Sequence, residues 1–93
     1  MEKIKLANTD LVVSRICAGC MGLGGGWEQD TVLTAEHEKQ ASDFLDAALQ
    51  QEINFFDTAN IYARGRSEEV FGRLLAKSPG LRQQIVLQSK CGI

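Results

Sequence analysis

The sequence has little of the features that mark specialised classes of protein. Its 93 residues include one proline, one histidine and three cysteines, and its formal net charge is only −2. Such a charge leaves no basic surface of the kind that binds nucleic acid, and no apolar run approaches the roughly 20 residues that cross a bilayer. An odd number of cysteines, with no apolar leader at the N-terminus, argues against a disulfide framework. We therefore expect a cytoplasmic protein with no nucleic-acid or membrane partner.

The composition is that of an ordinary globular domain. Apolar residues make up 44% of the chain and charged residues 24%, a balance that argues against disorder and against a fibrous fold. The length is that of one small domain, so residues 1–93 are treated as a single unit.

The spacing of apolar residues predicts a hairpin followed by alternating strands and helices. The predicted elements are a hairpin of residues 3–6 and 11–13, a buried strand of 15–18, a helix capped by Thr34, a strand of 53–56, a helix from Ser67 to Lys77 and a strand of 85–89. Apolar faces at helical spacing are expected from Ala41, Phe44, Leu45 and Ala48, and from Val70, Phe71, Leu74 and Leu75. This order predicts an α/β fold with a parallel sheet.

Three such strands cannot close a barrel, and the last one has no helix after it. We therefore expect a fragment with an open sheet edge, which self-associates or is disordered in solution.

Five of the nine glycines fall within residues 19–26, which predicts a loop with unusual dihedral angles or a close backbone approach. The run does not fit the dinucleotide fingerprint, because its third glycine would fall on Trp27 or on Gln29. Trp27 itself is either a lid over a site or cover for the hairpin.

Three chemically complementary side chains are expected at the carboxyl ends of the strands, where functional groups of parallel sheets collect. They are Asp57, Tyr62 and Lys90. A lysine ammonium stabilises a phenolate, and a carboxylate holds that ammonium charged and oriented. A phenol assisted in this way can act as a general acid towards a carbonyl oxygen. Each residue also has an ordinary structural interpretation: a turn residue, a packing tyrosine and a solvated lysine.

Three segments resemble the aldo-keto reductase family. Residues 53–72, INFFDTANIYARGRSEEVFG, resemble its signature, residues 85–92, IVLQSKCG, resemble the strand that ends in its lysine, and residues 13–24, VSRICAGCMGLG, resemble its first strand and loop. The spacing between Tyr62 and Glu68 is more similar to the bacterial oxidoreductase and potassium-channel β-subunit branches than to the aldose-reductase branch.

The resemblance implies a (β/α)8 TIM barrel, of which this chain supplies the N-terminal hairpin, the first three strands and two helices. It implies reduction of a small aldehyde or ketone with NADP(H), or alternatively NAD(H). Tyr62 is then the general acid, assisted by Lys90 and Asp57, and Cys20, Met21 and Asp57 lie on the cofactor side. The family's catalytic histidine follows the third strand, so the 93 residues alone are expected to be inactive. The alternative is a non-catalytic cofactor-binding or channel-β-like regulatory module.

A metal site is the weaker interpretation of the cysteines. Cys17 and Cys20 have CxxC spacing, and Cys91 with His37 would complete a Cys₃His set. However, the strands of Cys17 and Cys91 are expected two places apart in the sheet, about 10 Å. We expect no metal, buried cysteines that pack as small hydrophobes, and a solvated His37 in the first turn of its helix.

Overall fold

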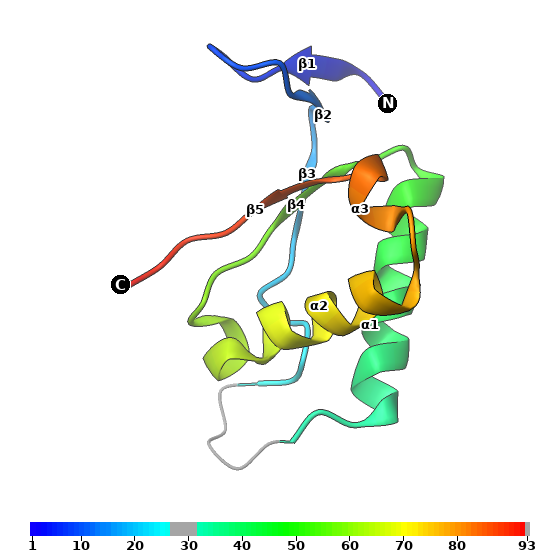
Figure 1. Ribbon diagram of the computed structural model, residues 1–93, viewed down its shortest axis with the longest axis vertical. Coiled ribbons are helices and arrows are strands. Elements are labelled where there is room, and N and C mark those ends of the chain that lie inside the picture. The colour runs from blue at the N-terminus through cyan, green and yellow to red at the C-terminus, as the bar shows by residue number, and fades with distance from the viewer. Residues whose placement is uncertain (27–31, 93) are drawn as a thin grey trace.

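The computed structural model describes residues 1–26 and 32–92 (Figure 1). In chain order the elements are β1 Lys3–Lys5, β2 Val12–Ser14, β3 Cys17–Gly19, α1 Ala35–Gln50, β4 Phe55–Asp57, the 3₁₀ turn η1 Tyr62–Gly65, α2 Arg66–Lys77, α3 Leu81–Gln84 and β5 Val86–Gln88. Strands β1 and β2 form an antiparallel hairpin, and β3, β4 and β5 form a parallel sheet in that order. The predicted hairpin and the predicted alternation of strands and helices are confirmed.

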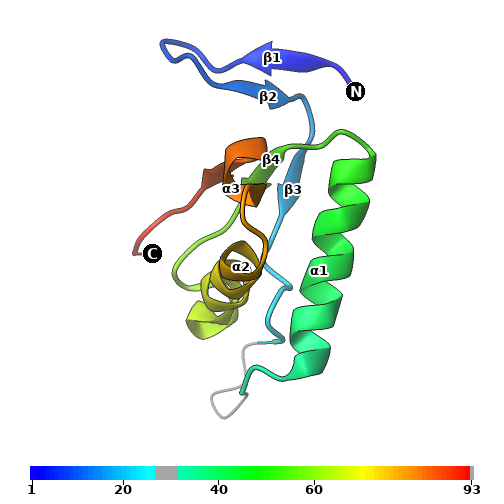
Figure 2. The same ribbon diagram turned by 45° about the vertical axis from the view of Figure 1, so that its right-hand side comes forward.

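The helices cover one face of the sheet. Ala18, Phe56 and Leu87 are in register across the three strands and contribute to the hydrophobic core. Phe56 is fully buried, and its ring packs edge-on against Phe44 of α1 and Phe71 of α2, with centroids 6.4 and 5.6 Å apart. Figures 1 and 2 show both helices beside the sheet, away from the hairpin. The predicted apolar faces of the two helices therefore meet over β4.

Strand β3 departs from the prediction of a buried strand. Cys17 and Gly19 are exposed, and Ala18 is half-buried. Side chains alternate along a strand, so only Ala18 faces the helices. Cys17 shares the other face with Phe55 and Val86, its partners in register. Within the described residues that face is uncovered, which explains the exposure.

Helix α1 begins as predicted, with Thr34 as its N-cap. The Thr34 hydroxyl accepts a hydrogen bond from the backbone N–H of His37 at 3.3 Å, and Nδ1 of His37 accepts one from the Thr34 N–H at 3.1 Å. This is a capping box with histidine in the place where glutamate or glutamine is usual. The expectation of a solvated His37 was therefore wrong, since the half-buried ring satisfies a backbone donor of the helix start.

Helix α2 begins one residue earlier than predicted. Gly65, with φ +94°, is its N-cap, and Ser67 lies inside the first turn with no exposed surface. After α2 ends at Lys77, the short helix α3 follows, which the sequence pattern did not predict. Leu81 of α3 is buried in the core, so it is tertiary packing that favours this turn.

Asn54 fastens the hairpin to the amino end of the sheet. Its side-chain oxygen accepts a hydrogen bond from the N–H of Ser14 at 2.7 Å, and its amide donates to the carbonyl of Val12 at 3.1 Å. The hairpin therefore lies at the opposite end of the strands from the loops that follow them (Figure 2). Across the described part of the chain, no helix combines the length and apolarity needed to span a membrane.

Candidate functional site

The candidate site lies at the carboxyl ends of β4 and β5. Asp57 is the last residue of β4 and is in register with Gln88, the last residue of β5. The pairing continues beyond the strands, since Thr58 N–H donates to the carbonyl of Gln88 at 2.8 Å and Asn60 N–H to that of Lys90 at 3.0 Å. These bonds bring Lys90 alongside the segment that follows Asp57.

The structure brings the three predicted catalytic residues together. Nζ of Lys90 donates to Oδ1 of Asp57 at 2.7 Å and to the carbonyl of Thr58 at 2.9 Å. The same Nζ lies 5.0 Å from the centroid of the Tyr62 ring, within the range of a cation–π contact. A carboxylate, an ammonium and a phenol therefore form one contiguous group at this edge of the sheet.

The ammonium of Lys90 is favoured by its surroundings. Its hydrogen bond to Asp57 is the largest cause that raises the pKa of Lys90 above its usual value; desolvation opposes this shift, and the nearby Tyr62 side chain adds to it. The lysine side chain is 45% exposed and that of Asp57 25% exposed. The Lys90 ammonium is thus charged at neutral pH, and it is open to a ligand.

The backbone after Tyr62 is unusual. Ala63 and Arg64 adopt left-handed conformations, with φ of +50° and +55°, and Gly65 follows at +94°. Only glycine adopts this region without cost. Three left-handed residues in succession turn the chain sharply between Tyr62 and α2, which holds the tyrosine at the strand ends while α2 packs on the sheet.

Sequence reasoning missed Gln88. Its side-chain amide donates to Oδ1 of Asp57 at 2.7 Å, the same oxygen that accepts from Lys90. The available signal was the strand register, because Gln88 and Asp57 end adjacent strands and point to the same face. Gln88 therefore helps to orient the carboxylate.

The two residues predicted on the cofactor side have different environments. Met21 is 56% exposed, whereas Cys20 has no exposed surface and belongs to the hydrophobic core. Burial, with the nearby Asp57 charge, raises the pKa of the Cys20 thiol to about 12. The structure therefore does not support a contact between the Cys20 side chain and a cofactor, although its N–H donates to the carbonyl of Asp57 at 2.8 Å.

The expectation that all three cysteines pack as buried hydrophobes holds only for Cys20. Cys17 and Cys91 are exposed, because Cys17 faces the uncovered side of the sheet and Cys91 follows its last strand. Among residues 1–26 and 32–92, no group of three or more His, Cys, Asp or Glu side chains is placed to hold a metal ion. Trp27, the predicted lid or cover, lies outside the described residues.

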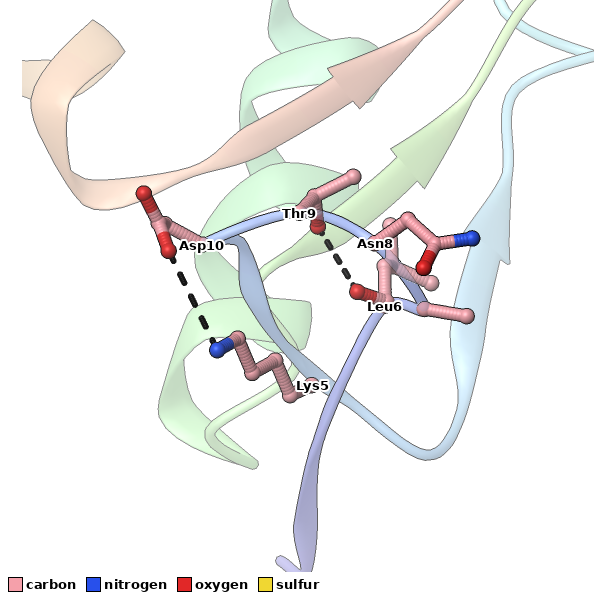
Figure 3. A pocket seen from close by; sticks show the side chains of 6 residues that line it. Lys5, Leu6, Asn8, Thr9 and Asp10 are labelled. Carbon is pink, nitrogen blue, oxygen red and sulfur yellow. Dashed lines mark hydrogen bonds and ion pairs between the residues drawn. The ribbon is translucent and has the colours of Figure 1, made fainter.

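A recess at the hairpin turn is separate from this site. It is lined by the consecutive residues Lys5, Leu6, Ala7, Asn8, Thr9 and Asp10 (Figure 3). The Thr9 hydroxyl donates to the carbonyl of Leu6 at 2.8 Å, and Lys5 pairs with Asp10 at 3.9 Å. The recess is thus the concave side of a single turn, whose polar groups bond to one another.

Known proteins with similar sequences and structures point to one family. Residues 15–93 match the model of the aldo/keto reductase family. The chain is 35% identical over 91 residues to the versiconal hemiacetal acetate reductase of Aspergillus parasiticus, covering 98% of this chain and 26% of that protein. It is 38% identical over 95 residues to the NADH-specific methylglyoxal reductase of Escherichia coli K12, covering 100% and 27%.

A solved structure extends the similarity to three dimensions. The holo form of aldo-keto reductase AKR11C1 from Bacillus halodurans superposes with a TM-score of 0.74 at 36% identity, covering 99% of this chain and 26% of that one. The chain spans about a quarter of the length of these relatives. The family match covers most of the chain, including Asp57, Tyr62 and Lys90, and the chain belongs to the aldo/keto reductase family.

Proposed function

We propose that these residues form the N-terminal hairpin, the first three strands and the first helices of a (β/α)8 barrel enzyme that reduces aldehyde or ketone carbonyls with NADP(H), or alternatively NAD(H). The observation that carries this proposal is the position of Lys90 Nζ, 2.7 Å from Asp57 Oδ1 and 5.0 Å from the Tyr62 ring centroid. The uncovered face of the sheet, which bears Asp57 and Gln88, would be the inner face of that barrel.

In this proposal Tyr62 is the general acid. Reducing a carbonyl adds a hydride to its carbon and a proton to its oxygen, and the Tyr62 O–H supplies the proton. The phenolate left behind is stabilised by the ammonium of Lys90, which Asp57 and the carbonyl of Thr58 hold in place. Gln88 limits rotation of the Asp57 carboxylate through its own hydrogen bond.

The donor set fits a nicotinamide cofactor. Phenol, ammonium and carboxylate groups can move a proton but cannot supply the hydride that carbonyl reduction requires, so the reaction needs a hydride donor. A reduced nicotinamide supplies that hydride when bound. Of this chain's residues, Met21 and Asp57 would lie on the cofactor side, and both have exposed surface at the strand ends.

The preference between the two cofactors is part of the proposal. The relative from Escherichia coli is named an NADH-specific reductase, and AKR11C1 is described as a holo form. We propose NADP(H) as the cofactor, with NAD(H) as the alternative, and the assay tests both.

The test is Tyr62→Phe in the full-length protein, with carbonyl-dependent oxidation of NADPH and NADH as the readout. Loss of a general acid is expected to lower kcat about 10²- to 10⁴-fold. Lys90→Met is expected to lower it as well. Lys77→Met is the matched control, since Lys77 pairs with Glu38 on the exposed side of α2.

Two results would count against the proposal. Full carbonyl reduction by Tyr62→Phe would remove the mechanism. A wild-type protein that binds NADPH but reduces no member of a carbonyl panel would favour the regulatory module. Residues 1–93 alone are expected to show no turnover, because the rest of the proposed barrel is absent.

A further inference from the structure

We propose that Arg66 and Ser67 are positioning residues, which clamp the loop of residues 20–26 to the segment that carries Tyr62. The inference rests on the proposed function, because it concerns how the cofactor side of that site is held relative to the general acid. No residue of the clamp belongs to the group formed by Asp57, Tyr62 and Lys90.

Arg66 is the first half of the clamp. It is 7% exposed, although arginine is rarely buried. Its Nε donates to the carbonyl of Gly24 at 3.0 Å and its Nη2 to that of Gly26 at 2.5 Å. A charged donor to a backbone carbonyl is stronger than a neutral one, and the fork-shaped guanidinium fixes two points of the loop at once.

Ser67 is the second half. It has no exposed surface, and its hydroxyl donates to the carbonyl of Leu23 at 2.5 Å, with the carbonyl of Met21 at 3.5 Å. Adjacent residues in the first turn of α2 therefore bind carbonyls at both ends of the stretch from 21 to 26.

Gly24 shows how close the two segments are. Its φ is +84°, and a Cβ built on it would lie 2.8 Å from the backbone carbon and oxygen of Arg66. A real Cβ does not approach backbone atoms so closely. Glycine at this position thus serves both the backbone conformation and the contact with α2.

The loop is held from the sheet side as well. Cys20 N–H donates to the carbonyl of Asp57 at 2.8 Å, and Leu23 N–H to that of Cys20 at 3.1 Å. Exposed Met21 therefore lies between Cys20, which bonds to Asp57, and residues 23–26, which bond to Arg66 and Ser67. Tyr62 is separated from Arg66 only by the rest of η1. Releasing the clamp would let the loop move relative to Tyr62, and small displacements of reacting groups cost large factors in rate.

The test compares Arg66→Met, Gly24→Ala and the double variant in the full-length protein. Arg73→Met is the control, because Arg73 lies on the same helix and pairs with Glu38 and Glu69.

Backbone hydrogen exchange of residues 20–26, without cofactor, measures how firmly the loop is held. NADPH binding and the split between kcat and KM report its consequence. If Arg66→Met does not fold, Arg66→Lys is measured instead, because lysine keeps the positive charge but lacks the planar guanidinium that bonds to two carbonyls.

Both single variants are expected to speed exchange in residues 20–26 and to raise the Kd and KM for NADPH about tenfold or more. The double variant should add little, because both changes break one contact. Unchanged exchange, or faster exchange with unchanged NADPH binding, would overturn the inference. A wild-type protein that binds NADPH without reducing carbonyls would contradict the proposed function. The roles of Arg66 and Ser67 in holding the loop would still be tested by the NADPH Kd of the variants.

Discussion

The ammonium of Lys90 lies 2.7 Å from Oδ1 of Asp57, although the two residues are 33 positions apart in the chain. The parallel pairing of β4 with β5 sets this distance, since it brings the ends of the two strands to one edge. The pair has a consequence for pH that can be measured directly.

The hydrogen bond from Lys90 to Asp57 is the largest cause of the raised pKa of Lys90. A raised lysine pKa adds stability in full below the ordinary value of 10.5, and that stability is lost as pH rises through the folded-state value. Asp57→Asn should lower the pKa of Lys90, as followed by NMR titration of its side chain. In the control Asp43→Asn, which removes the partner of Lys39, the titration of Lys90 should not change. An unaltered Lys90 titration in Asp57→Asn would contradict the assignment.

The three cysteines should differ in reactivity. Cys91 and Cys17 are exposed, whereas Cys20 is buried and its pKa is raised to about 12. Because the thiolate is the reactive species, iodoacetamide at neutral pH should label Cys91 and Cys17 and leave Cys20 until the chain unfolds. Partial burial of the thiol raises the pKa of Cys17, so its labelling should be slower than for an unperturbed thiol. Peptide mass spectrometry measures the three rates, and labelling of Cys20 at the rate of Cys91 would refute its burial.

The buried thiol also makes stability fall at alkaline pH. Above the ordinary cysteine value of 9.0, Cys20 ionises in the unfolded chain but stays protonated in the folded one. The folded state then binds the extra proton, so the free energy of unfolding decreases as pH rises from 9.0 towards about 12. Cys20→Ala should reduce this dependence in thermal unfolding followed by circular dichroism. An equally steep dependence in that variant would assign the effect to other groups.

Glu52 occupies a backbone position that suits glycine. It follows α1 with φ +61°, and Glu52 and Ile53 N–H donate to the carbonyls of Leu49 and Ala48, both at 2.9 Å, which closes the helix end. Glu52→Gly should raise the free energy of unfolding by about 0.5–1 kcal/mol, because it removes a left-handed side chain. The control Gln51→Gly, at φ −92°, should lower stability by about 0.5–1 kcal/mol. Chemical denaturation measures both, and a destabilising Glu52→Gly would show that the side chain matters more than the backbone.

Residues 1–93 should self-associate through the outer edge of β5. Within the described residues β5 pairs only with β4, and an unpaired strand edge is a template for pairing with another chain. Sedimentation velocity should show concentration-dependent association. Val86→Lys, on the uncovered face of this strand, should reduce it, whereas Gln83→Lys on α3 adds the same charge elsewhere and should not. A monodisperse monomer that melts cooperatively would contradict the prediction.

The strands, the two long helices and the nearness of Asp57, Tyr62 and Lys90 could be predicted from the sequence, because they follow from local patterns and from a general rule of parallel sheets. The apolar spacing of the two long helices and the cap at Thr34 are encoded within a few residues. The positions of Asp57 and Lys90 follow from the rule that strand ends of a parallel sheet share one edge. The side chains that support them could not be predicted in this way. The bond from Gln88 to Asp57, and the bonds from Arg66 to the carbonyls of Gly24 and Gly26, join residues more than 30 positions apart.

By itself the sequence determined the order of strands and helices, the apolar faces of the helices and the presence of a carboxylate, a phenol and an ammonium near the strand ends. The tertiary structure alone decided which cysteine is buried, that Gln88 bonds to Asp57 across the strand ends, and that the guanidinium of Arg66 bonds to the carbonyls of Gly24 and Gly26. The physical reason is the separation along the chain over which each effect acts. Backbone propensity and side-chain periodicity act over a few residues, whereas burial and long-range hydrogen bonds depend on which distant segments share a surface once the sheet has paired.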